Sequence, residues 1–157
     1  MTTHIMSLTY APKIEAVKSG RINQTIRLVR SDVDKKKGDK LIIHTWEGKP
    51  YRSKWGWRLE TRIKESLLLK VDDQNEWWIF DNKDFLRGLP IQPHWRQLFL
   101  DELMEFAKLD GIEPPTFGGL CHTLAKLNGL NSLCGTYWNV IRWPSVVEHQ
   151  QTYRKME

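Results

Sequence analysis

Residues 51–64 constrain the fold most strongly, because their apolar and basic side chains alternate more regularly than those of any other stretch. A period of two predicts a β-strand with one buried face, and Gly56 within it predicts a bulge or the close approach of another backbone. The basic row either follows a phosphate backbone or is a solvated face, and the tryptophans either fill the core or stack on bases. The apolar positions are Tyr51, Trp55, Trp57, Leu59 and Ile63, and the basic ones are Arg52, Lys54, Arg58, Arg62 and Lys64.

The other segments complete the prediction of an α+β fold. Apolar alternation or continuous apolar runs predict strands over 5–10, 23–30, 40–47, 67–71, 76–80 and 137–143. Helices are predicted from Ala11 to Gly20, over 97–110, and from Pro114 to Gly129, with proline near two of the starts and glycine after the ends. The third helix is expected to turn Phe117, Leu120, Cys121, Leu124 and Leu127 inward. We therefore expect one domain over 1–157, with its core over about 8–143 and a polar C-terminal tail over 144–157.

Several classes of protein are disfavoured by the composition. No apolar run approaches the roughly 20 residues that span a membrane, and the first residues do not resemble a secretory signal. Cys121 and Cys134 are the only cysteines, and neither has a zinc-type spacing with a histidine. We expect Cys121 to be a core residue and His122 a surface residue. The expectation is thus a cytoplasmic protein with reduced thiols, no metal and no other cofactor.

The positive charge is concentrated in the first half of the chain. Residues 1–70 contain 16 Lys and Arg against 7 Asp and Glu, whereas residues 71–157 contain 8 against 12. A basic half of this kind predicts a polyanionic partner such as nucleic acid, although scattered lysine can also serve solubility alone.

The most informative stretch for function follows Gly20. In a strand over 23–30, Thr25 and Arg27 project to the same side, while Ile26 and Leu28 project to the other. A hydroxyl next to a guanidinium can hold an oxyanion or a base edge. The alternative is that Arg27 pairs with an acid and that Thr25 is an ordinary strand residue.

These motifs resemble the ASCH domain family, whose signature is Gly-x-Lys-x-x-Glu-x-Arg. Gly20 and Arg27 match its ends, and Thr25 stands at the glutamate position, as in a subset of the family. The segment 37–41 is similar to the family's Gly-Asp turn and following strand, and 138–143 is similar to its closing strand. The resemblance covers about residues 8–143, and it implies a PUA-like mixed β-barrel with flanking helices.

The same resemblance implies a catalytic site with one departure. In members similar to N4-acetylcytidine amidohydrolases, the signature lysine, a threonine at the position of Thr25 and an acid in the helical segment form the catalytic set. The acid falls loosely at Asp110, but Ile22 stands where the lysine is expected. Isoleucine can neither activate a nucleophile nor hold an oxyanion. Arg21 is adjacent, but neighbouring side chains on extended backbone point in opposite directions.

Three functions follow as hypotheses. The first is a module that binds RNA or a modified nucleotide, in which Trp46 stacks on a base. The second is an enzyme with Thr25 as nucleophile and Asp110 as base, either an amidohydrolase acting on N4-acetylcytidine-type nucleosides or a weak ribonuclease. The third is a protein-interaction module with a vestigial cleft. The predicted ligand-binding residues are Gly20, Arg21, Asn23, Thr25, Arg27, Trp46, Arg52, Lys54 and Arg58.

Overall fold

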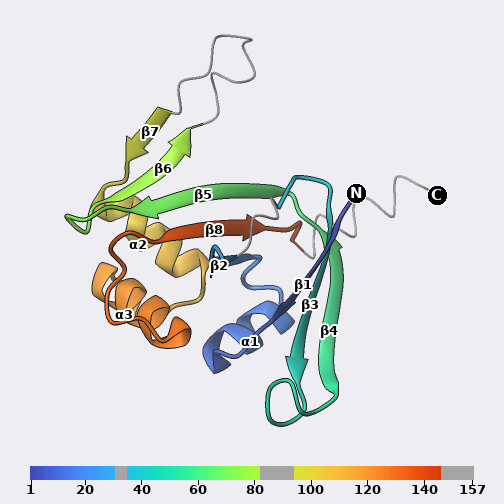
Figure 1. Ribbon diagram of the computed structural model, residues 1–157. Helices are drawn as coiled ribbons and strands as arrows, with labels where there is room; N and C mark the ends of the chain where they lie inside the picture. The colour runs from blue at the N-terminus through green and yellow to red at the C-terminus, as the bar shows by residue number, and fades with distance from the viewer. Residues whose placement is uncertain (31–34, 82–93, 146–157) are drawn as a thin grey trace.

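The computed structural model describes residues 1–30, 35–81 and 94–145, and its regular elements form two sheets and three helices (Figure 1). The three-stranded sheet has the order β1-β3-β4, with β1 (Thr3–Ser7), β3 (Lys40–Trp46) and β4 (Trp55–Arg62). The five-stranded sheet has the order β2-β8-β5-β6-β7, with β2 (Gln24–Leu28), β8 (Tyr137–Arg142), β5 (Glu65–Val71), β6 (Trp77–Asp81) and β7 (His94–Gln97). The helices are α1 (Ala11–Lys18), α2 (Leu100–Leu109) and α3 (Phe117–Asn128). The prediction of a mixed α+β fold is confirmed.

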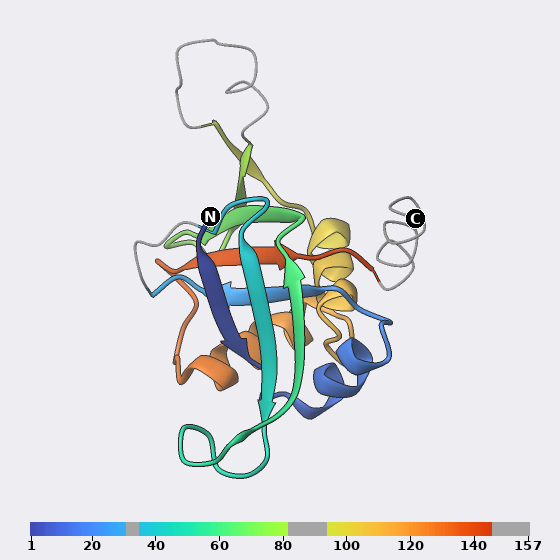
Figure 2. The same cartoon turned by 90° about the vertical axis from the view of Figure 1, so that its right-hand side faces the viewer.

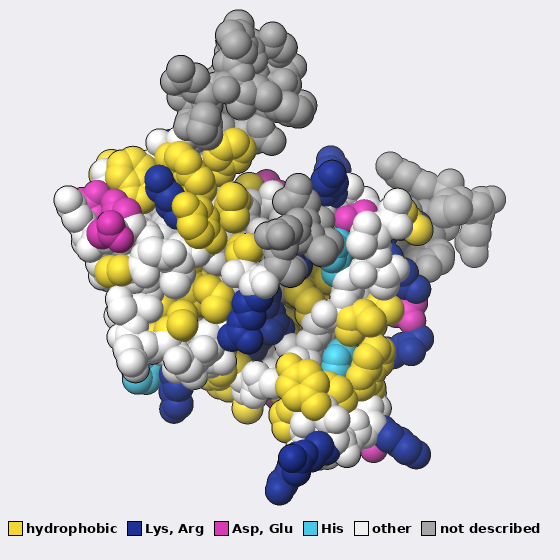
Figure 3. Space-filling view, in the orientation of Figure 1, with side chains coloured by type: hydrophobic (Ala, Val, Ile, Leu, Met, Phe, Trp, Pro, Cys, Tyr) yellow, Lys and Arg dark blue, Asp and Glu magenta, His cyan; other side chains and the backbone are white. Residues whose placement is uncertain are grey.

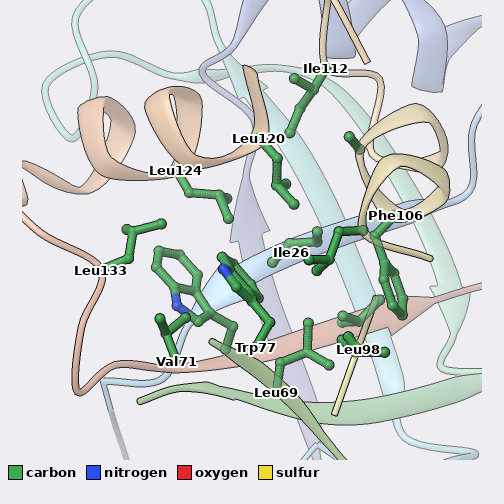
Figure 4. Packing of buried hydrophobic residues seen from close by; sticks show 14 residues of the cluster. Ile26, Leu69, Val71, Trp77, Leu98, Phe106, Ile112, Leu120, Leu124 and Leu133 are labelled. Atoms are coloured by element: carbon green, nitrogen blue, oxygen red, sulfur yellow. The ribbon is translucent and has the colours of Figure 1, made fainter. Parts of the chain in front are cut away.

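The elements form layers around two apolar clusters. Figure 2 shows the strands of the three-stranded sheet crossing those of the five-stranded sheet. The cluster between the sheets includes Leu41, Ile43, Ile63 and Ile141. On the other face of the five-stranded sheet, α2 and α3 cover a larger cluster, which Figure 4 shows from close by. Because the two sheets do not join into one closed ladder among the described residues, the expected closed barrel is not confirmed.

Local signals placed both ends of α1 and the C-terminal end of α3, whereas α3 begins at Phe117 and not at Pro114. Proline lies in the first turn of α1, and Gly20 after its end has a φ of 73°. The hydroxyl of Thr116 accepts a hydrogen bond from the Gly119 amide at 3.0 Å, and Gly129 ends α3 with a φ of 65°. At the start of a helix a side-chain acceptor binds a free backbone N–H group, and at its end a glycine adopts the left-handed conformation that allows the last carbonyl groups to be bonded.

Several boundaries differ from the predictions. The strand predicted over 51–64 begins at Trp55, since residues 47–54 form a loop in which Tyr51 has a φ of 63° and is 85% exposed. The alternation was therefore misleading at Tyr51, although Gly56 does lie opposite a register shift between His44 and Trp46. The register shift supports the bulge among the two predicted alternatives, since the atom nearest to a Cβ built at Gly56 is the Thr45 side-chain hydroxyl, at 3.1 Å, and not another backbone.

The segment before α2 also differs. Gln97, the first residue of the predicted helix, is instead the last residue of β7, and α2 begins at Leu100. The predicted inward position of Leu127 is wrong, since this side chain is 48% exposed at the end of α3. The segment 82–93 lies outside the described residues, as does the predicted C-terminal tail over 144–157 from residue 146 onward. In the described part of the chain, no helix is long and apolar enough to cross a membrane.

Candidate functional site

A small pocket opens along the free edge of β2, where α1, α3 and the end of α2 meet. Its volume is about 70 Å³. Figure 3 shows Lys and Arg side chains gathered near the centre of the face that carries this region. The lining residues are Leu8, Thr9, Tyr10, Lys13, Thr25, Ile26, Arg27, Asp110, Thr123, Leu124, Leu127 and Asn128. The pocket thus combines one cation from a helix, one acid from a helix end, and a hydroxyl and a guanidinium from one strand.

Lys13 and Asp110 form a buried ion pair inside the pocket. Lys13 Nζ lies 2.6 Å from Asp110 Oδ1, and the two residues are only 6% and 4% exposed. Asp110 Oδ1 also accepts a hydrogen bond from the Ile26 amide at 2.7 Å, so the acid links α1 to the free edge of β2. Such a pair is held by the fold, because a charge left alone at this depth would be strongly unfavourable.

The end of α2, which carries Asp110, packs closely against the segment that follows α1. Asp110 is the C-cap of the helix, and Gly111 follows it with a φ of 70°. A Cβ at Gly111 would come within 2.8 Å of Ile22 Cδ1. Glycine therefore serves both the left-handed turn and the contact. Ile22, the residue at the signature lysine position, packs against the cluster between the sheets rather than lining the pocket.

Burial changes the ionisation of both partners. It lowers the pKa of Lys13 from 10.5 to about 8, an effect opposed by the negative charge of Asp110 and increased by the positive charge of Arg27. Burial also raises the pKa of Asp110, against the attraction of Lys13 and Arg27. Both shifts favour transfer of a proton from the amine to the carboxylate. A substantial fraction of Lys13 is consequently a free amine near pH 8.

Thr25 and Arg27 project together from β2, as the alternation predicted, and both line the pocket. The Arg27 guanidinium donates a hydrogen bond to the carbonyl of Ser7 at the end of β1. Its Nε is buried and has no partner among the described residues. A buried donor left without an acceptor costs about 1–3 kcal/mol. An oxygen atom placed beside Arg27 Nε would satisfy this donor.

The other residues predicted near Gly20 do not line the pocket. Gly20 provides the left-handed turn after α1, and Arg21 is exposed, with its Nε hydrogen-bonded to the Ser19 hydroxyl at 3.2 Å. Asn23 donates to the Trp143 carbonyl at 2.7 Å, which ties the start of β2 to the end of β8. Of the residues predicted from this stretch, the structure brings only Thr25 and Arg27 together with Asp110.

Lys13 is a pocket-lining residue that the sequence-based prediction did not name. Ile22 stands at the signature lysine position, but α1 supplies a lysine to the pocket from nine positions earlier in the sequence. A signal was present: Lys13 lies three and four residues before Ala16 and Val17, so it shares their side of the helix. A lysine on the apolar side of a short helix either is buried against an acid or opposes folding.

The β3–β4 hairpin carries the remaining predicted residues. The His44 ring stacks on Trp55 with a distance of 4.2 Å between ring centroids, and it lies edge to face with Trp46 at 4.8 Å. The ring centroids of Trp46 and Tyr51 are 5.4 Å apart. The three predicted cations, Arg52, Lys54 and Arg58, are exposed on this hairpin, and Arg58 pairs with Glu60. These residues form a surface distinct from the pocket.

Neither cysteine has the features of a catalytic or metal-binding group. Cys121 packs against the larger cluster, where burial raises the pKa of its thiol, and Cys134 is exposed. His122 is exposed, as predicted. Over the described ranges, no three His, Cys, Asp or Glu side chains are grouped as metal ligands would be.

No protein-family model, curated protein or solved structure matches this chain.

Proposed function

We propose that the pocket hydrolyses a small acyl group from the exocyclic nitrogen of an N-acylated pyrimidine nucleoside, with Thr25 as the nucleophile. The observation that carries the proposal is the buried Lys13–Asp110 pair, 2.6 Å apart, in a pocket that Thr25 and Arg27 also line. It supplies the cation that Ile22 does not. The proposal includes an ASCH-type ancestry, in which the two sheets are an opened form of the PUA-like barrel.

Lys13 is the proposed general base. A neutral amine can donate one hydrogen to Asp110 and still present its lone pair to the Thr25 hydroxyl. Because the pKa of Lys13 is lowered to about 8, this form is available near neutral pH, as general-base catalysis requires. Asp110 keeps the amine in place through its bonds to Lys13 and to the Ile26 amide. Its own role is thus one of positioning, in place of the role as base that the sequence predicted.

The reaction would proceed in two halves. The Thr25 oxygen attacks the acyl carbon while Lys13 takes its proton, and Lys13 then gives that proton to the departing nucleoside nitrogen. Water next attacks the threonine ester, which releases the carboxylic acid and restores the hydroxyl. Arg27 is the proposed group for stabilising the oxyanion in both halves, since it is a half-buried cation whose buried Nε has no acceptor among the described residues.

The size of the pocket limits what can enter it. A cavity needs about 10–15 Å³ to hold one water molecule. The volume of about 70 Å³ therefore accommodates a group of a few non-hydrogen atoms. An acetyl group and the edge of a base would fit, whereas the sugar would remain outside.

The direct test follows acetate release from N4-acetylcytidine by proton NMR. Thr25→Val removes the hydroxyl at nearly the same volume, and Lys13→Met removes the amine, so each should lower kcat by at least about 100-fold. Thr25→Ser keeps a hydroxyl and should retain measurable turnover. If the Val and Met variants release acetate as fast as the unmodified protein, the proposal is wrong.

A second candidate is binding without turnover. It is favoured by the orphaned Arg27 Nε, which calls for a ligand oxygen whether or not a bond is broken. In that case N4-acetylcytidine would shift the amide resonances of Ile26 and Arg27, and no acetate would form.

A further inference from the structure

We propose that the β3–β4 hairpin is a binding site for single-stranded nucleic acid, so that the acylated nucleoside reaches the pocket as one residue of a strand. The statement about the substrate rests on the proposed function, whereas strand binding by the hairpin stands on its own geometry. For this purpose the hairpin surface consists of His44, Trp46, Tyr51, Trp55, Arg52 and Lys54.

Exposed rings make this surface suitable for stacking. Tyr51 is 85% exposed and Trp55 is 37% exposed, although both belong to a chain of ring contacts that includes His44 and Trp46. His44 is buried and supports one face of Trp55, so the tryptophan is held while part of it stays accessible. Held aromatic rings accept bases with little loss of side-chain entropy and with little dependence on sequence.

The loop between the strands is ordered by its own hydrogen bonds. The Glu47 amide donates to the Lys54 carbonyl at 3.1 Å, and the Ser53 hydroxyl joins the Gly48 amide to the Lys49 carbonyl at 3.0 Å each. Within this loop Tyr51 adopts a φ of 63°, a conformation that is unfavourable for a tyrosine. That conformation accompanies the exposure of the ring.

The charge on the hairpin complements a phosphate backbone. Residues 47–58 contain the cations Lys49, Arg52, Lys54 and Arg58 against one acid, Glu47. Over the described ranges, Arg52 and Lys54 have no ion pair, whereas Arg58 is paired with Glu60. Figure 3 shows hydrophobic side chains over the hairpin and Lys and Arg side chains at its end. Rings beside unpaired cations favour a nucleic-acid strand over an apolar protein surface.

The hairpin is also connected to the pocket. Ser7, whose carbonyl accepts a hydrogen bond from Arg27, pairs in register with His44. A strand stacked on Tyr51 and Trp55 would therefore run toward the opening of the pocket, where the acyl group could enter.

The test is the binding of a fluorescein-labelled ten-nucleotide oligouridine, followed by fluorescence anisotropy at two salt concentrations. Tyr51→Ala and Trp55→Ala should each raise Kd by about 5- to 150-fold, the range that corresponds to the loss of one stacked base. Arg52→Ser with Lys54→Ser should lower the slope of log Kd against log salt by about 1.4, or about 0.7 for each lost phosphate contact. Trp55→Phe keeps a ring and should stay within a few-fold of the unmodified protein.

A matched control removes two cations elsewhere. Lys108 and Lys126 are exposed on α2 and α3, and replacing both with serine should leave the salt slope within error of the unmodified protein. Equal losses in the control pair and the hairpin pair would overturn the proposal, because they would show attraction by overall charge. Binding of poly-glutamate as tight as that of oligouridine would also overturn it, since an acidic peptide cannot stack.

The two proposals fail in distinguishable ways. Release of acetate from free N4-acetylcytidine without binding of the oligonucleotide overturns the hairpin site alone. Oligonucleotide binding that depends on Tyr51 and Trp55, without any release of acetate, supports the hairpin site and removes the proposed hydrolysis.

Discussion

The pocket and the hairpin surface use similar side chains in opposite surroundings. In the pocket, Lys13 and Arg27 are enclosed with Asp110, and the cation and the acid are bonded directly. On the hairpin, Arg52 and Lys54 extend from an exposed loop and have no ion pair within the described ranges. The aromatic rings also differ in setting, because Tyr51 and Trp55 are accessible while the pocket is lined mostly by aliphatic and polar groups.

This difference in burial determines how the charged side chains of each region behave. Enclosure removes water, so each charge in the pocket depends on its partner and its pKa responds to the others. Exposure keeps the hairpin cations hydrated and available to a polyanion in a salt-dependent way. The pocket is therefore suited to chemistry at one atom, and the hairpin to holding a long ligand.

The same substitution in both regions should give the largest contrast. Lys13→Met leaves Asp110 buried without its partner, and we expect it to lower the free energy of unfolding by about 3–5 kcal/mol. Lys54→Met lies on the exposed loop and should change it by no more than about 0.5 kcal/mol. Equilibrium unfolding in urea, with each variant compared at constant m-value, measures both.

A double variant separates charge from packing in that experiment. Lys13→Met combined with Asp110→Asn removes both charges and keeps an acceptor for the Ile26 amide, so it should recover most of the loss. Similar destabilisation by Lys13→Met and Lys54→Met would show that burial does not distinguish the two regions.

The shared orientation of Thr25 and Arg27 was predictable because it has a local cause. Thr25 and Arg27 share a side because a strand has a period of two, and this holds whatever packs against them. Asp110 came from the resemblance to a family, not from a local pattern. Lys13 was missed because its ion pair with Asp110 forms only when α1 packs against the end of α2. The two residues are nearly a hundred positions apart in the sequence.

The fold shows the same division. The ends of α1 and α3 were predictable from proline, threonine and glycine, whose preferences act within one turn. β7 was not, since His94–Gln97 has only four residues and is a strand because it pairs with β6. Tyr51 fitted an alternating pattern but lies in a loop, because the register shift between His44 and Trp46 changes how the hairpin closes. Pairing between distant segments decided these points.

Removing the charge of Asp110 tests whether Lys13 is the general base in the pocket. Its negative charge raises the pKa of Lys13, so Asp110→Asn should move the rising limb of the pH profile of kcat/KM to lower pH by about 1–2 units. Lys13 acts as a base only when it is deprotonated. Without the negative charge of Asp110 its ammonium form is less stable, so Lys13 loses its proton at a lower pH. Asp101→Asn, on the exposed first turn of α2, is the matched control and should leave the limb in place. A limb that stays at the same pH in Asp110→Asn would exclude Lys13 as the base.

A modest effect on the stability of the fold is expected at Trp55. Its stacking on His44, with ring centroids 4.2 Å apart, is worth about 0.5–1.5 kcal/mol beyond the burial of its area, so Trp55→Ala should lower the free energy of unfolding by at least that amount. The fully buried Trp138 belongs to the larger cluster, and its replacement with alanine should cost about 3–5 kcal/mol. Thermal and urea unfolding of the two variants compare them directly. A small stability loss at Trp55 together with a large loss of oligouridine affinity would mean that the ring is kept at the surface for a ligand. A loss as large as that at Trp138 would instead make Trp55 a structural residue, and the hairpin would then lose one of its two stacking positions.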